Sequence, residues 1–464
     1  MAEMTRPAGK VLGVFSLVMI NVIAVNSLRS LPISAEYGLS LVTYYLLASL
    51  LFFIPSALIA AELATGWPHT GGVYVWMREA FGKKWAFLAI WLQWIYNVVW
   101  YPTILAFIAA TFAYLIDPQL AHNQTFILLS VLAIYWCTTL INCFGMRASS
   151  WMSVIGALLG TLLPISLVIG LALLWLLKGQ PLQISLSSKA LLPNLSNWDN
   201  LGFLTAVLFG LAGMEMSAVH AEDVRNPQRD YPRALLYSTL TIFISLVLGS
   251  LAIAMVVPKE QLSLVAGVMD AFAIFLNAYH LGWALPLVAL FIVIGGICSV
   301  STWSFGPTKG LLVAAHDGII PPALLRVNRF GAPSAILITQ AAIFTVLCSV
   351  FLVFPSVNSS YWILTVLTSQ LALLFYILLF ACAIKLRYKH PTKPRAYRLP
   401  GGNFWMWLVA GAGILSCFAT FLLGFMPPAQ MQLGNVCLYE SVLLGGIVLV
   451  SFSAFLLPKL RKVN

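Results

Sequence analysis

Long apolar runs separated by short polar loops make up most of the sequence. The runs cover residues 11–35, 39–63, 85–115, 125–143, 151–177, 201–221, 233–257, 283–314, 333–354, 361–385, 404–425 and 436–457. An α-helix needs roughly 20 apolar residues to cross about 30 Å of hydrocarbon, and these runs are too long for membrane strands. The pattern therefore predicts an all-α integral membrane protein, with twelve transmembrane helices in a single transmembrane domain. We expect the first run to be retained as a helix and not removed as a signal peptide.

Composition supports the same class and excludes several others. The chain has 464 residues, of which 61% are hydrophobic and 8% charged, and its mean hydropathy is +0.94. Because soluble proteins carry about 25% charged residues, a water-soluble enzyme, a nucleic-acid-binding protein and a disordered chain are excluded. The seven cysteines stand singly without CxxC spacing, so we expect reduced packing residues and no disulfide framework.

The basic residues predict the orientation of the helices. Of the 25 lysines and arginines, Lys178, Lys189 and Lys259 fall on one side of the twelve predicted helices, Arg29 lies within a helix, and all others fall on the opposite side. The positive-inside rule makes the basic side cytoplasmic. We therefore expect a multi-pass protein of the cell (inner) membrane with both termini in the cytoplasm, and this topology accounts for the net charge of +11.

Two of the predicted helices contain helix-breaking sequences. Residues 21–32 of the first hold two asparagines, two serines, an arginine and a proline, and residues 209–217 of the sixth hold Gly210, Gly213 and an acid. Unwound backbone survives in a membrane only where protein or a polar cavity covers it. Helices one and six are five helices apart, and an odd number of helices per repeat inverts the repeat, as in many transporters. The pattern favours a transport site over close helix packing at the glycines.

Arg29 and Glu215 are the ionisable residues within these segments. Each costs about 2.5–3.5 kcal/mol at the centre of a membrane helix, so such residues usually face the bundle interior. For Arg29 the alternative is a side chain that extends outward to the membrane surface. For Glu215 the alternative is a structural acid that accepts hydrogen bonds from freed backbone N–H groups.

Several short motifs carry a resemblance to a known family. They are residues 55–62 with Ala64 and Thr65, residues 71–76 (Gly-Gly-Val-Tyr-Val-Trp), residues 213–218 followed by 222–234, residues 306–310 and 317–321, and residues 397–402 (Tyr-Arg-Leu-Pro-Gly-Gly). In this order they resemble the amino acid–polyamine–organocation superfamily, and within it the bacterial glutamate/γ-aminobutyrate antiporter branch. The resemblance covers nearly the whole chain. It implies a leucine-transporter-like fold with inverted five-helix repeats over 11–190 and 201–385, broken helices one and six, and two extra helices over 404–457.

The resemblance also implies where a substrate binds. In that family the α-carboxylate and α-ammonium groups bind backbone freed by the two breaks, which suits the opposite dipole ends of half-helices. The implied binding residues are Asn26, Ser27, Leu28 and Arg29 in the first helix, and Phe209, Gly210, Leu211, Ala212, Gly213 and Glu215 in the sixth. Trp303 matches an aromatic position that closes over substrate, with plain packing as the alternative. For the aromatic stripe Trp94, Tyr96, Trp100 and Tyr101, packing is the favoured interpretation.

The sequence thus predicts a secondary active amino acid antiporter that works by alternating access. It has no GxxxxGK[ST] motif to couple ATP hydrolysis. A proton- or sodium-coupled symporter is the alternative, with a proton on Glu215 or a sodium ion at Ser299, Ser301 and Thr302. A membrane-embedded enzyme and a transporter-like sensor are less favoured. We expect no enzymatic activity, cofactor, metal or nucleic-acid partner. The expected substrate is a small molecule, either an amino acid or a decarboxylated amine, and the protein contacts membrane lipid. Both a monomer and a homodimer stay open.

Overall fold

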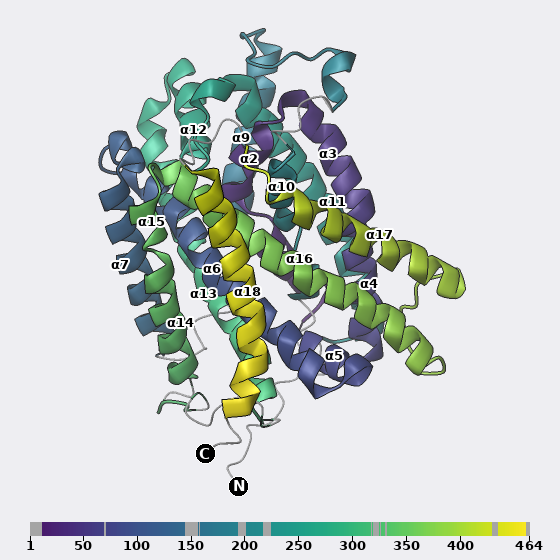
Figure 1. Cartoon of the computed structure of the whole chain (residues 1–464). Helices are drawn as coiled ribbons and strands as arrows, with labels where there is room; N and C mark the ends of the chain where they lie inside the picture. Colours follow the sequence, from purple (N-terminus) through teal and green to yellow (C-terminus); the bar gives the residue numbers. More distant parts are fainter. Residues whose placement is uncertain are drawn as a thin grey trace.

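The computed structural model is an all-helical bundle (Figure 1). It describes residues 12–68, 71–143, 156, 158–193, 201–216, 224–316, 318, 324, 326–329, 332–428 and 435–460. Among these residues the one extended pairing is an isolated bridge between Leu12 and Val224. The motif residues 217–223, 317 and 319–321 lie outside the described residues.

Eleven helical segments in the described residues are long and apolar enough to cross a membrane. They are Val14–Ala35, Gly38–Gly66, Lys83–Ala113, Gln124–Cys143, Leu158–Leu177, Arg229–Val256, Gly282–Ser301, Ser334–Val353, Val357–Lys389, Gly402–Leu423 and Val436–Leu456. Each corresponds to one predicted run. The remaining run, residues 201–221, is described to residue 216 and contains a shorter apolar segment, Phe203–Met216. The all-helical membrane class is therefore confirmed, while the count of twelve crossings stays a prediction.

Within these segments the helices have the following bounds. The first half contains α1 (Val14–Val25), η1 (Leu28–Ser30), α2 (Leu31–Ala35), α3 (Leu41–Ala48), η3 (Ser49–Phe53), α4 (Ile54–Gly66), α5 (Val73–Phe81), α6 (Lys83–Ala113), α7 (Gln124–Cys143), η6 (Leu158–Leu162) and α9 (Leu163–Leu177). The second half contains α10 (Phe203–Gly210), α11 (Pro227–Val256), α12 (Gly267–Ala278), α13 (Leu285–His316), α14 (Ser334–Leu347), α15 (Val350–Val353), α16 (Val357–Lys389), α17 (Gly402–Leu423) and α18 (Val436–Leu460).

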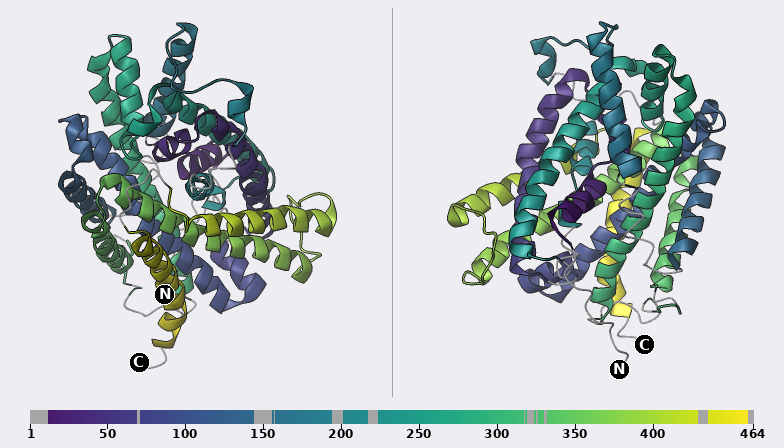
Figure 2. Two further views of the ribbon diagram at one scale, coloured as in Figure 1. Left: turned by 45° about the horizontal axis from the view of Figure 1, so that its top comes forward. Right: turned by 180° about the vertical axis from the view of Figure 1, so that it is seen from behind.

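Two long helices, α6 and α16, form the centre of the bundle. The apolar stretch of α6 is 94% buried and that of α16 is 83% buried, whereas α18 is only 17% buried and lies on the outside. Helix α1 packs against α11, and in the view from behind it crosses the middle of the bundle (Figure 2, right). The outer helices expose large apolar side chains such as Leu50, Phe404 and Leu449. An apolar outer surface of this kind suits contact with lipid tails.

Prolines account for the local irregularities of two helices. The π-helical turn η3 precedes Pro55 at the start of α4, and η6 precedes Pro164 at the start of α9. Proline has no N–H to donate and its ring clashes with the preceding turn. A wider turn before each proline lets the chain continue in nearly the same direction.

A buried ionic cluster joins α4 to the segment between α16 and α17. Glu62 accepts hydrogen bonds from Arg387 at 2.6 and 2.7 Å, from the Leu399 N–H at 2.8 Å and from Arg395. Glu62 and Arg387 are each only 1% exposed. The Arg387 guanidinium also donates to the carbonyl groups of Leu399 and Gly402. Glu62 thus fixes the loop that follows α16.

The cysteines differ in their burial. All seven are free. Four of them, Cys298, Cys348, Cys382 and Cys417, are buried in the helical core, where a small apolar side chain packs well.

Candidate functional site

The first helical segment is interrupted between α1 and η1. Helix α1 ends at Val25, and the backbone is extended at Asn26 (φ −76°, ψ 102°) and Ser27 (φ −122°, ψ 123°) before η1 begins at Leu28. The Ser27 carbonyl accepts hydrogen bonds from the Ser30 N–H at 3.1 Å and from the Ser30 hydroxyl at 2.8 Å. Polar side chains here compete with the helical hydrogen bonds and favour such a turn.

A second interruption follows α10. The helix ends at Gly210, and the chain resumes a helical turn at Met214. Gly213 has φ +122°, a backbone conformation that glycine adopts without steric cost. Its N–H, freed from the helix, donates to the Tyr376 hydroxyl at 2.6 Å, so the break leaves no orphaned donor at this position.

The two interruptions lie against one another. A Cβ atom placed on Gly213 would lie 3.2 Å from the Ala24 carbonyl oxygen, and one on Gly210 would lie 3.4 Å from the Ser30 Cβ. The first of these distances is tighter than an ordinary van der Waals contact and the second is an ordinary one, so the two backbones pack closely. The sequence-distant segments around residues 24–30 and 209–213 therefore share one wall.

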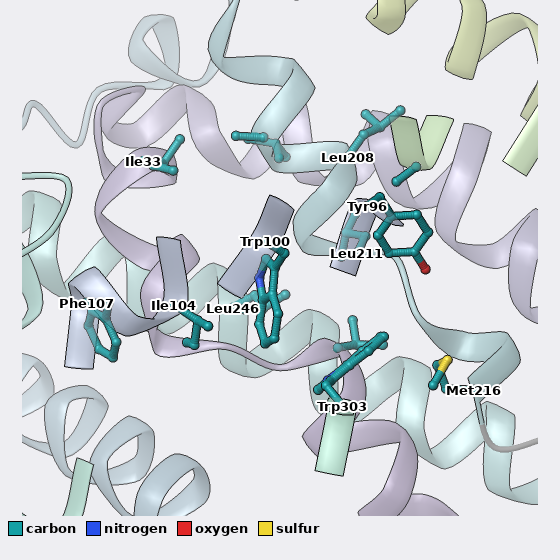
Figure 3. Close-up of a cluster of buried hydrophobic side chains, with 14 of the residues drawn as sticks. Ile33, Tyr96, Trp100, Ile104, Phe107, Leu208, Leu211, Met216, Leu246 and Trp303 are labelled. Atoms are coloured by element: carbon teal, nitrogen blue, oxygen red, sulfur yellow. The ribbon is translucent and has the colours of Figure 1, made fainter. Parts of the chain in front are cut away.

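A cavity of about 40 Å³ opens beside this wall. It is lined by Ala24, Val25, Ser27, Arg29 and Ser30 of the first segment, by Tyr96, Asn97 and Trp100 of α6, by Phe209, Gly210 and Ala212 after α10, and by Trp303 of α13. Figure 3 shows Trp100 and Trp303 extending toward one another, with Tyr96 beside Leu211. The cavity combines aromatic rings with a few polar groups, the usual composition of a small-molecule site.

The predicted site residues divide into two groups. Ser27, Arg29, Phe209, Gly210, Ala212 and Trp303 line the cavity. Asn26, Leu28, Leu211, Gly213 and Glu215 are buried behind its wall and do not line it. Asn26, for example, donates to the Ser245 hydroxyl at 2.8 Å, which fixes the first interruption to α11.

Aromatic rings close the cavity. The Trp100 and Trp303 ring centres are 5.8 Å apart, and Tyr96 meets Phe209 edge to face at 6.3 Å. A water molecule needs roughly 10–15 Å³ by a comparable measure, so the cavity has room for a few waters. Two residues of the aromatic stripe on α6, Tyr96 and Trp100, line the cavity. The other two pack elsewhere: Trp94 donates a hydrogen bond to Gln340, and Tyr101 contacts the ring of Tyr135.

Arg29 is 4% exposed and directed into the bundle. Its Nη1 atom donates to the Thr103 and Tyr361 hydroxyls, each at 3.2 Å. The guanidinium carbon lies 5.8–5.9 Å from the ring centres of Trp100, Phe209 and Tyr361. The side chain does not extend outward to the membrane surface, and within the described residues no carboxylate forms an ion pair with it.

Glu215 is 1% exposed. Its Oε2 accepts a hydrogen bond from the Tyr376 hydroxyl at 2.7 Å, and its Oε1 has no hydrogen-bond partner. Tyr376 therefore joins the carboxyl group to the freed Gly213 N–H. Glu215 makes no ion pair with Arg29 or with another base in the part of the chain that the structure describes.

Sequence reasoning did not single out several residues of this region. Asn97 lines the cavity. Thr103 and Tyr361 accept hydrogen bonds from Arg29, and Tyr376 accepts one from the Gly213 N–H. Asn97 is an amide within an apolar aromatic run, which was a signal available in the sequence. The two tyrosines belong to α16, and nothing in its local pattern distinguishes them from packing residues.

One of the three residues expected at a sodium ion makes a hydrogen bond between two helices. Ser301 donates to the Asn142 amide oxygen at 2.9 Å, so its hydroxyl is engaged between α13 and α7. No group of three or more His, Cys, Asp or Glu residues that could hold a metal occurs among the residues described.

Comparisons with known proteins identify the family. Residues 11–449 match the family described as amino acid permease. The chain belongs to the amino acid permease family. It is 56% identical over 450 residues to an uncharacterised transporter of Legionella pneumophila, with 97% of each chain covered. It is also 30% identical over 459 residues to a glutamate/γ-aminobutyrate antiporter of Lactococcus lactis, covering 97% of this chain and 91% of that one.

A third relative carries a different substrate in its name. The chain is 26% identical over 380 residues to a probable agmatine/putrescine antiporter of Lactococcus lactis, covering 80% of this chain and 78% of that one. The resemblance to the amino acid–polyamine–organocation superfamily is thus confirmed. The permease is a multi-pass membrane transporter for small molecules such as amino acids or amines, and it is not an enzyme.

Proposed function

We propose that this permease is a secondary active antiporter that exchanges amino acids of the glutamate and γ-aminobutyrate type by alternating access. The observation that carries the proposal is the cavity between the two interrupted segments, which joins freed backbone, a buried cation and aromatic rings. The glutamate/γ-aminobutyrate antiporter that matches over nearly the whole chain supports the same substrate class.

In this proposal the interruptions are corresponding parts of two inverted repeats. The repeats occupy residues 11–190 and 201–385, residues 201–221 form the sixth of the twelve crossings, and the helices within 404–457 are additions. Support comes from the position of each interruption in the first helix of its repeat, and from their mutual contact at Gly210 and Gly213. Interrupted segments at matching positions are a general feature of transporter sites.

The substrate's α-groups bind the backbone of both interruptions. Carbonyl groups at the end of α1 suit an ammonium group, and N–H groups at the start of η1 and after α10 suit a carboxylate. Ser27, Gly210 and Ala212 bring this backbone to the cavity. Asn26, Leu28, Leu211, Gly213 and Glu215 support it from behind.

Transport requires the cavity to open alternately to either side of the membrane. The close approach of Trp100 to Trp303, and of Tyr96 to Phe209, suits an arrangement closed around the site. We propose that Phe209 and Trp303 move aside as the two repeats rock against one another. The protein then works in the cell (inner) membrane with both termini in the cytoplasm, where the positive-inside rule puts its basic loops.

One observation favours a second mode, proton-coupled symport. Glu215 is a buried carboxyl group with an unpartnered oxygen and no ion-pair partner among the described residues. Buried carboxyl groups of this kind carry protons in many transporters. The test of the proposed function must therefore separate exchange from proton-driven uptake.

Proteoliposomes provide that test. Vesicles loaded with γ-aminobutyrate should accumulate labelled glutamate, while vesicles loaded with an osmotically matched sugar should accumulate none at any external pH. Protein-free vesicles control for leakage. Uptake into sugar-loaded vesicles that depends on acid outside would establish symport and overturn the exchange mechanism.

A further inference from the structure

Arg29 lines the cavity and keeps hydrogen-bond donors that no described residue engages. A guanidinium group has five N–H donors, and here only Nη1 is engaged, with Thr103 and Tyr361. The buried Nε has no partner, and Nη2 donates to no atom in the described part of the chain. The Nε–Nη2 edge of arginine matches the two oxygens of a carboxylate.

Among the residues that the structure describes, none provides a counter-ion for the buried charge of Arg29. Burying an ion without one costs several kcal/mol. The three aromatic rings lie 5.8–5.9 Å from the guanidinium carbon, at the limit of about 6 Å for such contacts, and offset part of this cost. Among the described residues that line the cavity, Arg29 is the one charged side chain. An anionic group entering the cavity would therefore neutralise it.

The chemistry of the two exchanged substrates indicates which anionic group that is. Decarboxylating glutamate at its α-carbon gives γ-aminobutyrate, so the two molecules share an ammonium group and the carboxylate at the far end of the chain. The α-carboxylate occurs only in glutamate. A residue that serves both directions of exchange must therefore bind the distal carboxylate.

We propose that Arg29 binds the carboxylate distal to the substrate's ammonium group and thereby sets the specificity of the permease. This inference rests on the proposed function. The freed backbone binds the ammonium group and, in glutamate, the α-carboxylate, while Arg29 with Thr103 and Tyr361 holds the opposite end. The same charge repels a cation in that position, so agmatine and putrescine are excluded although a relative is named for them.

Binding measurements on matched ligand pairs test the inference. Purified full-length protein is assayed for displacement of labelled glutamate by glutamate, glutamine, γ-aminobutyrate and putrescine. Because glutamine replaces only the distal carboxylate with an amide, the wild type should prefer glutamate by roughly 10- to 100-fold, the range of a hydrogen bond to a charged group. Putrescine should not compete.

Arg29→Gln should reduce the preference for glutamate over glutamine to within about threefold and weaken γ-aminobutyrate in parallel. Arg29→Lys keeps the charge and should retain part of the preference. Arg326→Gln removes an exposed arginine and should leave the ratio unchanged. For Arg29→Gln, labelled glutamine replaces glutamate as the displaced ligand, so a weakened glutamate site does not prevent the measurement. Thermal unfolding checks that each variant is folded.

The outcomes separate this inference from the proposed function. If the wild type binds and exchanges amino acids but Arg29→Gln keeps the glutamate preference, Arg29 does not bind the distal carboxylate and the inference is overturned. An equal loss for glutamate and glutamine would assign Arg29 to the α-carboxylate and overturn it as well. If the wild type exchanges no amino acid at all, the proposed function itself fails.

Discussion

At the residue scale, Tyr376 connects the interruption after α10 to Glu215, the acid in that segment. Its hydroxyl donates to Glu215 and accepts from the Gly213 N–H. A change in the charge of Glu215 therefore acts directly on the hydrogen bond that satisfies the interrupted backbone. The hydrogen bonds of Tyr376 thus link the protonation of Glu215 to the backbone conformation at Gly213, beside the cavity.

Glu215→Gln tests this path. The amide oxygen of glutamine can still accept the Tyr376 hydrogen bond, so the variant should fold with a thermal unfolding temperature close to that of the wild type. Without a titratable group, exchange should lose its pH dependence, and its rate should fall by about 100-fold, the lower end of the range for a proton-transferring residue. Glu440→Gln, at an exposed glutamate, is the matched control. Unchanged exchange at every pH would assign Glu215 a purely structural role.

Site residues that depart from the apolar pattern can be predicted from the sequence, whereas site residues that fit the pattern cannot. Arg29 and Glu215 are visible because charge is costly in a membrane helix, and the structure places both next to the interruptions. Tyr361 and Tyr376 contact the same groups but lie in an aromatic-rich helix, where a tyrosine has an ordinary packing role. Their importance depends on contacts over more than 160 residues of sequence separation, which no local pattern contains.

At the element scale, the end of α4 depends on the cluster around Glu62. One carboxylate faces two guanidinium groups, Arg387 and Arg395, and also accepts the Leu399 N–H. Removing one member of a buried ion pair leaves an uncompensated charge, which is more costly than the net value of the pair. The loop between α16 and α17 therefore depends on Glu62 for its position.

Glu62→Gln should destabilise the permease by roughly 3–5 kcal/mol because two guanidinium groups then lack their counter-ion. Chemical unfolding in detergent, followed by tryptophan fluorescence, measures the loss. Glu79→Gln is the matched control: this partly exposed glutamate offers only its backbone carbonyl to Lys389, so its change should stay within about 0.5 kcal/mol. A similar small effect at Glu62 would mean that the cluster is energetically neutral.

Most elements follow from the apolar pattern, and the exceptions have identifiable causes. Eleven predicted runs correspond to long apolar helices because hydrocarbon thickness fixes helix length. The run at 201–221 holds only the short α10 before its interruption, since Gly210 and Gly213 end the regular helix. Helix α12 (Gly267–Ala278) is amphipathic and too short to span, so a search for membrane helices overlooks it.

At the scale of the whole molecule, one buried carboxyl group lies at the end of a membrane segment. Glu36 lies directly after the first membrane segment and is 6% exposed, with an unpartnered Oε2. Burial raises the pKa of this carboxyl group to about 7; nearby Lys259 lowers it and Glu260 raises it. The ionised form is thus disfavoured at this end of the bundle.

The stability of the entire fold should therefore depend on pH through Glu36. Between pH 4.5 and about 7 the folded protein keeps a proton that the unfolded chain has lost. The free energy of unfolding then decreases as pH rises through this window, by at most roughly 3 kcal/mol, and becomes constant above it. Glu36→Gln is uncharged in both states, so the decrease in thermal unfolding temperature from pH 5 to pH 8 should be smaller than in the wild type, whereas Glu440→Gln should retain it. Equal decreases in wild type and Glu36→Gln would show that the pH dependence arises elsewhere, because no other change separates the two proteins.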